Sequence, residues 1–276
     1  MIINKTAYQI FKNGSKTYFY SSVFFPITVR SRVFILYSFV RKADNFVDSV
    51  PQDKDGFYRF KNDFYKRLKG EKVEDVVIES FVSLMKKFDI KKEWVDSFLG
   101  SMEMDINKKT YFNLDETIKY MYGSAEVIGI MMCKIMGLTE ESYHYARNLG
   151  RAMQYINFIR DINEDNQLGR LYLPLDILKK YDLNSLTYEE VSKKEEKFKG
   201  FLREQLDLYF KWQSVGEKGY RYIPKYLMVP IKTASDMYKY TAKRIYDDPF
   251  IVYKIKVKPR IRRIVFTGVK NIFNTF

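Results

Sequence analysis

The chain has 276 residues, of which 46% are hydrophobic, so it can bury a sizeable core in one large domain or two small ones. Its formal net charge of +14 favours negatively charged partners, such as nucleic acid, anionic lipid or a phosphorylated small molecule. The single cysteine, Cys133, excludes an internal disulfide, and the single histidine, His144, leaves too few ligands for a typical zinc or di-iron site. Any bound metal is therefore expected to have oxygen ligands.

The N-terminal segment, MIINKTAYQIFKNGSK, has no apolar signal-peptide core, and no apolar run approaches the roughly 18 to 20 residues of a membrane span. We therefore expect a cytoplasmic protein. No repeat or linker divides the chain, so residues 1–276 are predicted to form a single domain. Sparse glycine and proline, without sustained period-2 alternation, predict an all-α bundle of about eight to ten helices around a central helix or cavity.

The first segment with a chemical pattern is VFILYSFVRKADNFVD, from Val33 to Asp48, which we predict to be a helix. With 3.6 residues per turn, one stripe of this helix is polar and its other faces are apolar. The polar stripe consists of Tyr37, Arg41, Asp44 and Asp48.

The segment QYINFIRDINED, residues 154–165, repeats this pattern when it is taken as one helix. Its polar stripe consists of Gln154, Asn157, Asp161 and Asp165, while Ile156, Phe158, Ile159 and Ile162 occupy other faces. The segment is therefore acidic on one side and apolar around the rest of its circumference.

A polar stripe on a helix normally faces water, but a surface helix is not expected to be apolar everywhere else. We therefore predict that both stripes face an internal cavity. Carboxylates four residues apart repel one another, and several of them in one cavity would have raised pKa values unless cations neutralised them. Mg²⁺ fits best, because it combines one or two carboxylates with phosphate oxygens, and Mn²⁺ is an alternative.

A basic tail begins at about Lys254 with the sequence KIKVKPRIRRIVFTGVK, which interleaves basic and apolar residues and contains no acidic residue. Four interpretations stay open at this point. The tail could lie on an anionic bilayer, contact nucleic acid, close over a diphosphate, or be a solvated basic segment.

Three stretches of the sequence resemble signatures of the squalene and phytoene synthase family, the head-to-head (1'-1) prenyl synthases. The first aspartate motif corresponds to DNFVD, where Asn45 departs from the family pattern while Asp44 and Asp48 keep its spacing. YMYGSAEVIGIMMCKI matches a second signature, except that Glu126 stands where many members have a small residue. The most specific match is LGRAMQYINFIRDINEDNQLGRLYLP, through Leu149, Gly150, Gln154, Asn157, Arg160, Asp161, Asp165, Arg170, Tyr172 and Pro174.

The resemblance extends from about Phe11 to about Arg260 and weakens after Lys180. It implies an all-α isoprenoid synthase fold, a helical bundle around a central cavity. It implies four catalytic, metal-binding aspartates, with Asn157 as a further ligand: Asp44, Asp48, Asp161 and Asp165. It also implies substrate contacts from Ser15, Lys16, Thr17, Tyr37, Arg41, Gln154, Arg160, Tyr238 and Arg260.

The activity that this resemblance implies is that of a prenyltransferase. The segments FYSSVFFP, LYSFVRKADNFVD and YGSAEVIG are most similar to those of microbial phytoene synthases. These enzymes join two geranylgeranyl diphosphates through a cyclopropylcarbinyl (prephytoene) diphosphate. The alternative is a squalene or dehydrosqualene synthase that uses two farnesyl diphosphates. NADPH is not expected for phytoene, whereas squalene formation would require it.

The expected partners are prenyl diphosphates, and the tail leaves a peripheral membrane contact open, while no nucleic acid is expected. A terpene cyclase or a head-to-tail elongase would share the fold and the metal but is expected to carry a different second motif from NFIRDINED. A non-catalytic relative would be free to lose the four aspartates, and all four are present.

Overall fold

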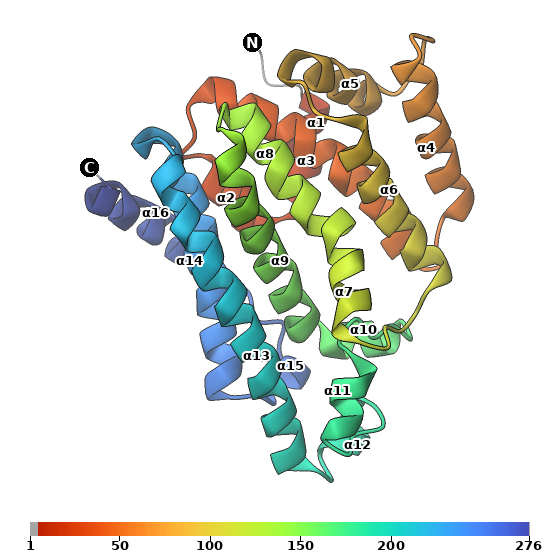
Figure 1. The fold of residues 1–276 in the computed structure, drawn as a ribbon, viewed down its shortest axis with the longest axis vertical. Helices are drawn as coiled ribbons and strands as arrows, with labels where there is room; N and C mark the ends of the chain where they lie inside the picture. The colour runs from red at the N-terminus through yellow and green to blue at the C-terminus, as the bar shows by residue number, and fades with distance from the viewer. Residues whose placement is uncertain (1–4, 276) are drawn as a thin grey trace.

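The computed structural model describes residues 5–275, and our expectations for residues 1–4 and 276 lie outside this range. Within it, the predicted all-α fold is confirmed, since the described part of the chain has no strand and only an isolated β-bridge, between Thr110 and Leu171. Figure 1 shows the long helices running roughly side by side. The α-helices are α1 (Lys5–Gly14), α2 (Lys16–Ser22), α3 (Ile27–Asp48), α4 (Lys54–Leu68), α5 (Val76–Phe88), α6 (Lys92–Asn107), α7 (Leu114–Met121), α8 (Val127–Met136), α9 (Tyr143–Arg160), α10 (Ile162–Gln167), α11 (Leu175–Lys180), α12 (Tyr188–Val191), α13 (Glu195–Glu217), α14 (Lys225–Asp247), α15 (Ile251–Lys254) and α16 (Ile261–Thr275).

The predicted number of helices, about eight to ten, is wrong for the described residues, which form sixteen α-helical segments. Ten of these have ten or more residues, and the other six are shorter. The short helices include α10, α11, α12 and α15. A helix of one or two turns leaves too few residues to produce a periodic pattern, so periodicity detects only the long ones.

Several helices begin at the capping residues that local sequence rules favour. The Ser15 hydroxyl accepts a hydrogen bond from the backbone N–H of Tyr18 at the start of α2. The Asp75 carboxylate does the same for Val77 at the start of α5. α8 ends at Gly137, whose φ of 73° lies in the left-handed region that glycine adopts without strain.

Helix α9 lies in the middle of the molecule, with α13 and α14 on one side and α8 and α3 towards the other (Figure 1). Two hydrophobic clusters surround it. One is built mainly by α1, α3 to α6 and α8, and the other by α7 and the helices from α9 to α15. Two glycines allow neighbouring backbones to approach closely, because a Cβ at Gly150 would lie 2.7 Å from the Ala125 oxygen and one at Gly216 would lie 2.8 Å from the Leu149 nitrogen.

The basic tail is not an extended segment. After α15 ends at Lys254, residues 255–260 cross the molecule and α16 follows, packed against α14 and α2. Across residues 5–275, no helix is both long and apolar enough to cross a membrane.

Candidate active site

A cavity of about 1140 Å³ lies between α2, α3, α8, α9 and α14, and the segment before α16 completes its wall. Its lining is apolar over much of its length, with side chains such as Phe25, Leu36, Phe98, Met132 and Met136. All nine residues predicted to contact substrate lie on the wall of this one cavity: Ser15, Lys16, Thr17, Tyr37, Arg41, Gln154, Arg160, Tyr238 and Arg260. Their individual roles remain predictions.

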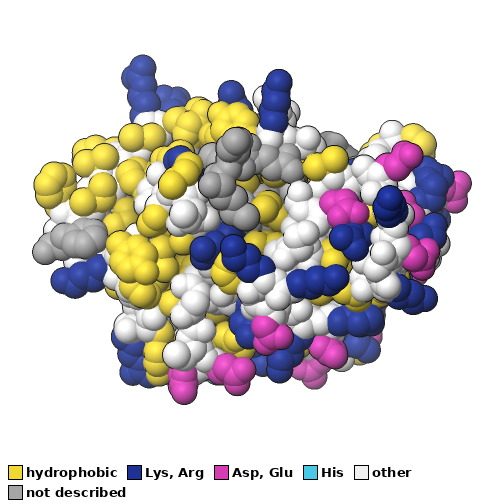
Figure 2. All heavy atoms as spheres, turned by 90° about the horizontal axis from the view of Figure 1, so that it is seen from above, with side chains coloured by type: hydrophobic (Ala, Val, Ile, Leu, Met, Phe, Trp, Pro, Cys, Tyr) yellow, Lys and Arg dark blue, Asp and Glu magenta, His cyan; other side chains and the backbone are white. Residues whose placement is uncertain are grey.

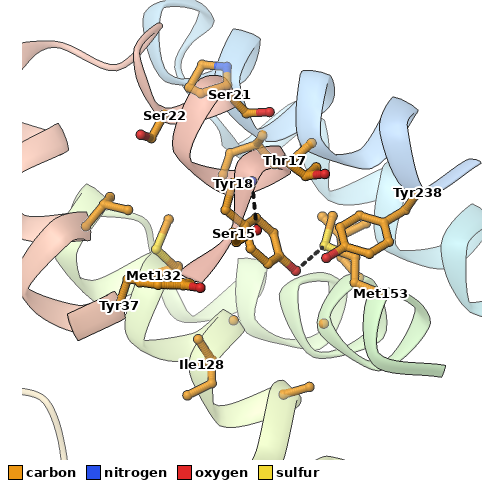
Figure 3. A pocket seen from close by; sticks show the side chains of 18 of the residues that line it. Ser15, Thr17, Tyr18, Ser21, Ser22, Tyr37, Ile128, Met132, Met153 and Tyr238 are labelled. Atoms are coloured by element: carbon orange, nitrogen blue, oxygen red, sulfur yellow. Dashed lines mark hydrogen bonds between the residues drawn. The ribbon is translucent and has the colours of Figure 1, made fainter. Parts of the chain in front are cut away.

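The middle of the cavity is bounded by aromatic and sulfur-containing side chains, which Figure 3 shows at close range. Tyr18 from α2 and Tyr238 from α14 lie beside one another, with 5.6 Å between their ring centroids. The Tyr18 hydroxyl points to the Met153 sulfur at 3.6 Å. Burial raises the pKa of both tyrosines above its ordinary value, so both are neutral hydroxyls at physiological pH.

The first acidic row consists of Asp44 and Asp48, in the last turns of α3. The predicted helix is therefore present, and Asp44 lies on the cavity wall with Tyr37 and Arg41. Arg41 donates to the Asp44 carboxylate at 2.5 Å, yet burial and the nearby charge of Asp48 raise the pKa of Asp44 to about 7. The guanidinium therefore does not fully compensate this carboxylate.

The second acidic row consists of Asp161 and Asp165, and it corrects one detail of the prediction. Residues 154–165 do not form one helix, because α9 ends at Arg160 and α10 begins at Ile162. Asp161 lies at the break with φ −96° and ψ 12°, while its N–H still donates to the Asn157 oxygen. The turn between the helices keeps both carboxylates next to the C-terminal end of α9, where Asn157 and Arg160 line the cavity.

The two acids of this row differ in their surroundings. Burial favours the neutral form of Asp161, but the Arg160 guanidinium at 2.8 Å and the Lys256 ammonium at 3.2 Å outweigh it, and its pKa lies below the usual value. Among residues 5–275, no basic side chain pairs with Asp165 in a comparable way. Burial and the charge of Asp161 raise the pKa of Asp165 to about 8.

Arg170 connects the two rows. Its guanidinium donates to the Asp48 carboxylate at 3.0 Å and to the Val47 carbonyl, while its backbone N–H donates to the Asp165 carbonyl at 2.8 Å. The charge of Asp48 also contributes to the raised pKa values of both Asp44 and Asp165. The end of α3 and the α10 segment therefore lie close to one another beside the cavity. In the described part of the chain, the cavity wall includes Asp44 and Asn157 but not Asp48, Asp161 or Asp165.

One buried acid beside these rows was missed from the sequence. Asp105, in α6, accepts hydrogen bonds from the hydroxyls of Tyr120 at 2.7 Å and Tyr172 at 2.8 Å. Burial raises its pKa to about 6. A signal was present, because Asp105 lies three residues after Met102 on a stripe of buried positions, where an acidic residue is unexpected.

Glu126, whose position departs from the family pattern, is fully buried in the π-helical turn before α8. Its carboxylate accepts from Arg147 at 2.8 Å and from Arg151 at 2.6 Å, both on α9. It therefore ties this turn to the central helix and is not a member of the acidic rows.

The oxygen atoms that could act as metal ligands in and beside the cavity fit a hard cation. The Asn157 side-chain oxygen is buried on the cavity wall without a hydrogen-bond partner, and the raised pKa values of Asp44 and Asp165 mark carboxylates that lack full compensation. In the described part of the chain, no three acidic, cysteine or histidine side chains converge closely enough to enclose an ion. Such a set suits Mg²⁺ that shares its coordination with diphosphate oxygens.

Comparison with known proteins places these features in a family. A model of the squalene/phytoene synthase family matches residues 11–265. The phytoene synthase of Arthrospira platensis is 25% identical over 89% of this chain and 84% of its own length. The 15-cis-phytoene synthase of Pantoea ananas is 28% identical over 63% of this chain and 60% of its own length. The phytoene synthase of Rhodobacter capsulatus is 30% identical over 61% of this chain and 51% of its own length.

Solved structures show the same fold. The squalene synthase HpnC from Alicyclobacillus acidocaldarius superposes with a TM-score of 0.78 over 88% of this chain and 93% of its own, at 17% identity. A dehydrosqualene synthase also reaches 0.78, over 98% of this chain and 93% of its own, at 19% identity. The chain therefore belongs to the squalene/phytoene synthase family, a family of prenyltransferases, and has the isoprenoid synthase fold that the sequence predicts.

Proposed function

We propose that the protein joins two geranylgeranyl diphosphates head to head (1'-1) to give phytoene, in a reaction that requires Mg²⁺. The observation that carries the proposal is the pair of acidic rows that Arg170 connects beside a large, mostly apolar cavity, with Asp44 and Asn157 on the cavity wall. Head-to-head prenyl transfer needs these two parts, since the substrate has a diphosphate head and a hydrocarbon tail. The curated relatives named phytoene synthase support the C20 substrate.

In this proposal, the acids of both rows and Asn157 hold Mg²⁺, which supplies the positive charge that a departing diphosphate requires. The residues of this chain add the remaining charge. Arg41 and Arg160 lie beside the acidic rows, and Lys16 and Arg260 lie on the same cavity wall. Charged donors fixed before the reaction stabilise the negative charge that develops as the C–O bond breaks.

Loss of the first diphosphate leaves an allylic cation, and the double bond of the second substrate attacks it. Loss of one proton then closes the cyclopropane ring of prephytoene diphosphate. This intermediate loses the second diphosphate, rearranges and gives up another proton, so that two substrates yield phytoene, two pyrophosphates and two protons. The apolar wall keeps water away from these cations, and the ring faces of Tyr18, Tyr37 and Tyr238 provide π surfaces that stabilise positive charge.

The test is product analysis with each substrate by itself. Purified protein in detergent with Mg²⁺ is incubated with geranylgeranyl diphosphate or with farnesyl diphosphate, with and without NADPH, and the hydrocarbon is extracted. We expect a C40 product from the C20 substrate, no effect of NADPH and no product in EDTA until Mg²⁺ is restored. A C30 product alone would replace phytoene with the squalene or dehydrosqualene alternative, and the absence of any hydrocarbon would refute the function.

We also propose a peripheral contact between the basic tail and an anionic membrane surface. Its basis is the excess of positive charge in a segment that borders the cavity, since Lys258 and Arg260 lie on the cavity wall. Both the prenyl substrates and the hydrocarbon product partition into membranes, so such a contact would shorten their path.

A further inference from the structure

Helix α16 buries its less apolar side and exposes its more apolar side, the reverse of what is expected for a helix in water. Its buried residues are Ile264, Gly268 and Asn271, of which two are small or polar. Its exposed side carries Phe266 and Phe273, which are 71% and 80% exposed. The same side includes the exposed residues Val265, Val269 and Ile272. A surface helix of a globular protein normally turns its apolar stripe towards the core, and here that stripe faces away from it.

Specific contacts fix the helix in this orientation. The Asn271 amide donates to the Asp236 carboxylate at 2.9 Å and to the Thr233 hydroxyl at 3.3 Å, both on α14. Gly268 packs so closely on Phe24 that a Cβ there would lie 2.0 Å from the ring. Turning the outer stripe inward would break the buried hydrogen bonds and force a bulky side chain onto Phe24. These contacts therefore hold the apolar stripe of α16 on the outside of the protein.

The turn between α2 and α3 enlarges this surface. Val23 and Ile27, on either side of Phe24 in sequence, are 40% and 50% exposed. We call the exposed apolar residues of α16 together with Val23 and Ile27 the outer face. Figure 2 shows hydrophobic side chains gathered on the side of the molecule where α16 lies in Figure 1, with Lys and Arg side chains at the border.

The charged residues of α16 itself are all basic, while the carboxylate that the helix contacts, Asp236 on α14, is hydrogen-bonded to Asn271. Arg262, Arg263 and Lys270 are exposed on α16, and the chain carries no acidic residue from 249 to 275. An apolar stripe flanked by basic residues complements a bilayer with anionic headgroups, because acyl chains take up the apolar side chains and lipid phosphates pair with the cations.

The same helix belongs to the cavity wall through its first turn. Ile261 and Arg262 line the cavity, together with the preceding Pro259 and Arg260. A bilayer that receives the outer face would therefore lie next to one wall of the cavity.

We propose that α16 is an in-plane membrane anchor, whose outer face inserts among the acyl chains of an anionic bilayer while Arg263 and Lys270 contact the lipid phosphates. The anchor holds the cavity against the bilayer, so that hydrocarbon product passes into lipid without crossing water. The docking assigns the membrane contact proposed above to one helix and its residues, and the delivery step rests on the proposed head-to-head synthesis.

The test is co-flotation with vesicles of phosphatidylcholine, with and without phosphatidylglycerol. The wild-type protein is expected to float with the vesicles that contain phosphatidylglycerol. Phe266→Ser/Phe273→Ser is expected to lower this partition by at least about tenfold, because two large apolar side chains leave the bilayer. The matched control is Phe112→Ser, since Phe112 is 57% exposed in the loop between α6 and α7, away from the outer face. This control is expected to bind as the wild type does.

A second pair of substitutions tests the charges. Arg263→Gln/Lys270→Gln is expected to lose most of the preference for phosphatidylglycerol, while turnover in detergent stays at the wild-type level for all these variants. Wild-type protein that ignores anionic vesicles, or a Phe266→Ser/Phe273→Ser variant that binds them equally, would overturn the proposal. So would a wild-type dimer that this variant converts to monomer, because a second copy would then cover the outer face. Failure of the proposed function is separate, and would appear as missing product in detergent whatever the vesicles show.

Discussion

Two aspartates, Asp161 of the second acidic row and Asp44 of the first, differ in how far the protein itself neutralises them. In the second row, Asp161 contacts both Arg160 and Lys256, and its pKa is lowered in spite of burial. In the first row, Asp44 has Arg41 at 2.5 Å, and its pKa is nevertheless raised to about 7. Two cations overcome the cost of burial and one does not.

This difference locates the unsatisfied charge of the site. Asp44 on α3 and Asp165 on α10 keep raised pKa values, and the oxygen of Asn157 on α9 has no partner. One acceptor from each of three helices is thus incompletely compensated, and two of them, Asp44 and Asn157, lie on the cavity wall. We expect a cation to complete the compensation of these three groups, whereas Asp161 already has basic partners.

The largest effect is expected from Asp44→Asn and Asp161→Asn. Either change should reduce turnover in detergent by at least about a thousandfold, because both acids are proposed to hold Mg²⁺. Their effects on stability should differ. Asp161→Asn removes the carboxylate that pairs with Arg160 and Lys256, leaving Lys256 paired with Glu164, and should cost about 1 to 3 kcal/mol in the free energy of unfolding. Asp44→Asn removes an uncompensated charge and should cost nothing at pH 8.

Thermal unfolding and steady-state turnover check this pair, with Asp207→Asn on the exposed side of α13 as the control. Wild-type turnover in either variant would contradict the metal assignment. Equal losses of stability in Asp44→Asn and Asp161→Asn would show that the protein neutralises these two acids to the same extent.

The next effect is a dependence on pH. Asp44 and Asp165 have folded pKa values of about 7 and about 8, so the folded state holds protons that the unfolded state releases at lower pH. Their contribution to stability is therefore present at low pH and is lost as pH rises to about 8. A cation must displace these protons, so Mg²⁺ with inorganic pyrophosphate should raise the melting temperature more at pH 8 than at pH 6.

Differential scanning fluorimetry at both pH values measures this shift. Asp44→Asn should reduce the difference between the two pH values, since one of the two titrating acids is gone. An equal shift at pH 6 and pH 8 in the wild type would show that protons and cation do not compete.

The smallest effect is expected from Lys256→Gln, which leaves Asp161 with one basic partner, as Asp44 has. Lys256 contacts Asp161 and Glu164, and it competes with a metal for these carboxylates. Its removal should lower the Mg²⁺ concentration for half-maximal turnover by about two- to fivefold, as expected for one partly exposed ion pair. Lys254→Gln is the control, because it removes an ion pair to Asp248 in the same segment. A higher Mg²⁺ requirement would indicate that Lys256 does not compete with the metal.

The sequence predicted the fold and the membership of the cavity wall better than it predicted the contacts between elements. Helical periodicity identified the polar stripe of α3, and the family signatures selected residues from five separate helices or loops that line one cavity. Periodicity defines the faces of one helix, however, and does not show what lies opposite each face. Lys256 pairs with Asp161, and Arg170 pairs with Asp48. Both contacts join segments far apart in the chain.

Two further features show the same limit. Asp105 lies outside the three family signatures, and only the fold brings Tyr120 and Tyr172 to its carboxylate. The break at Asp161 changes the helix geometry without ending its chain of hydrogen bonds, so no proline or glycine marks it.

Calorimetric binding of inorganic pyrophosphate tests most directly whether the acidic rows capture diphosphate through a divalent cation. The wild-type protein is expected to bind pyrophosphate when Mg²⁺ is present and not to bind it measurably in EDTA. The variants Asp44→Asn and Asp165→Asn are expected to lose the Mg²⁺-dependent binding. Binding of equal affinity in EDTA, or full Mg²⁺-dependent binding by both variants, would contradict this capture of diphosphate.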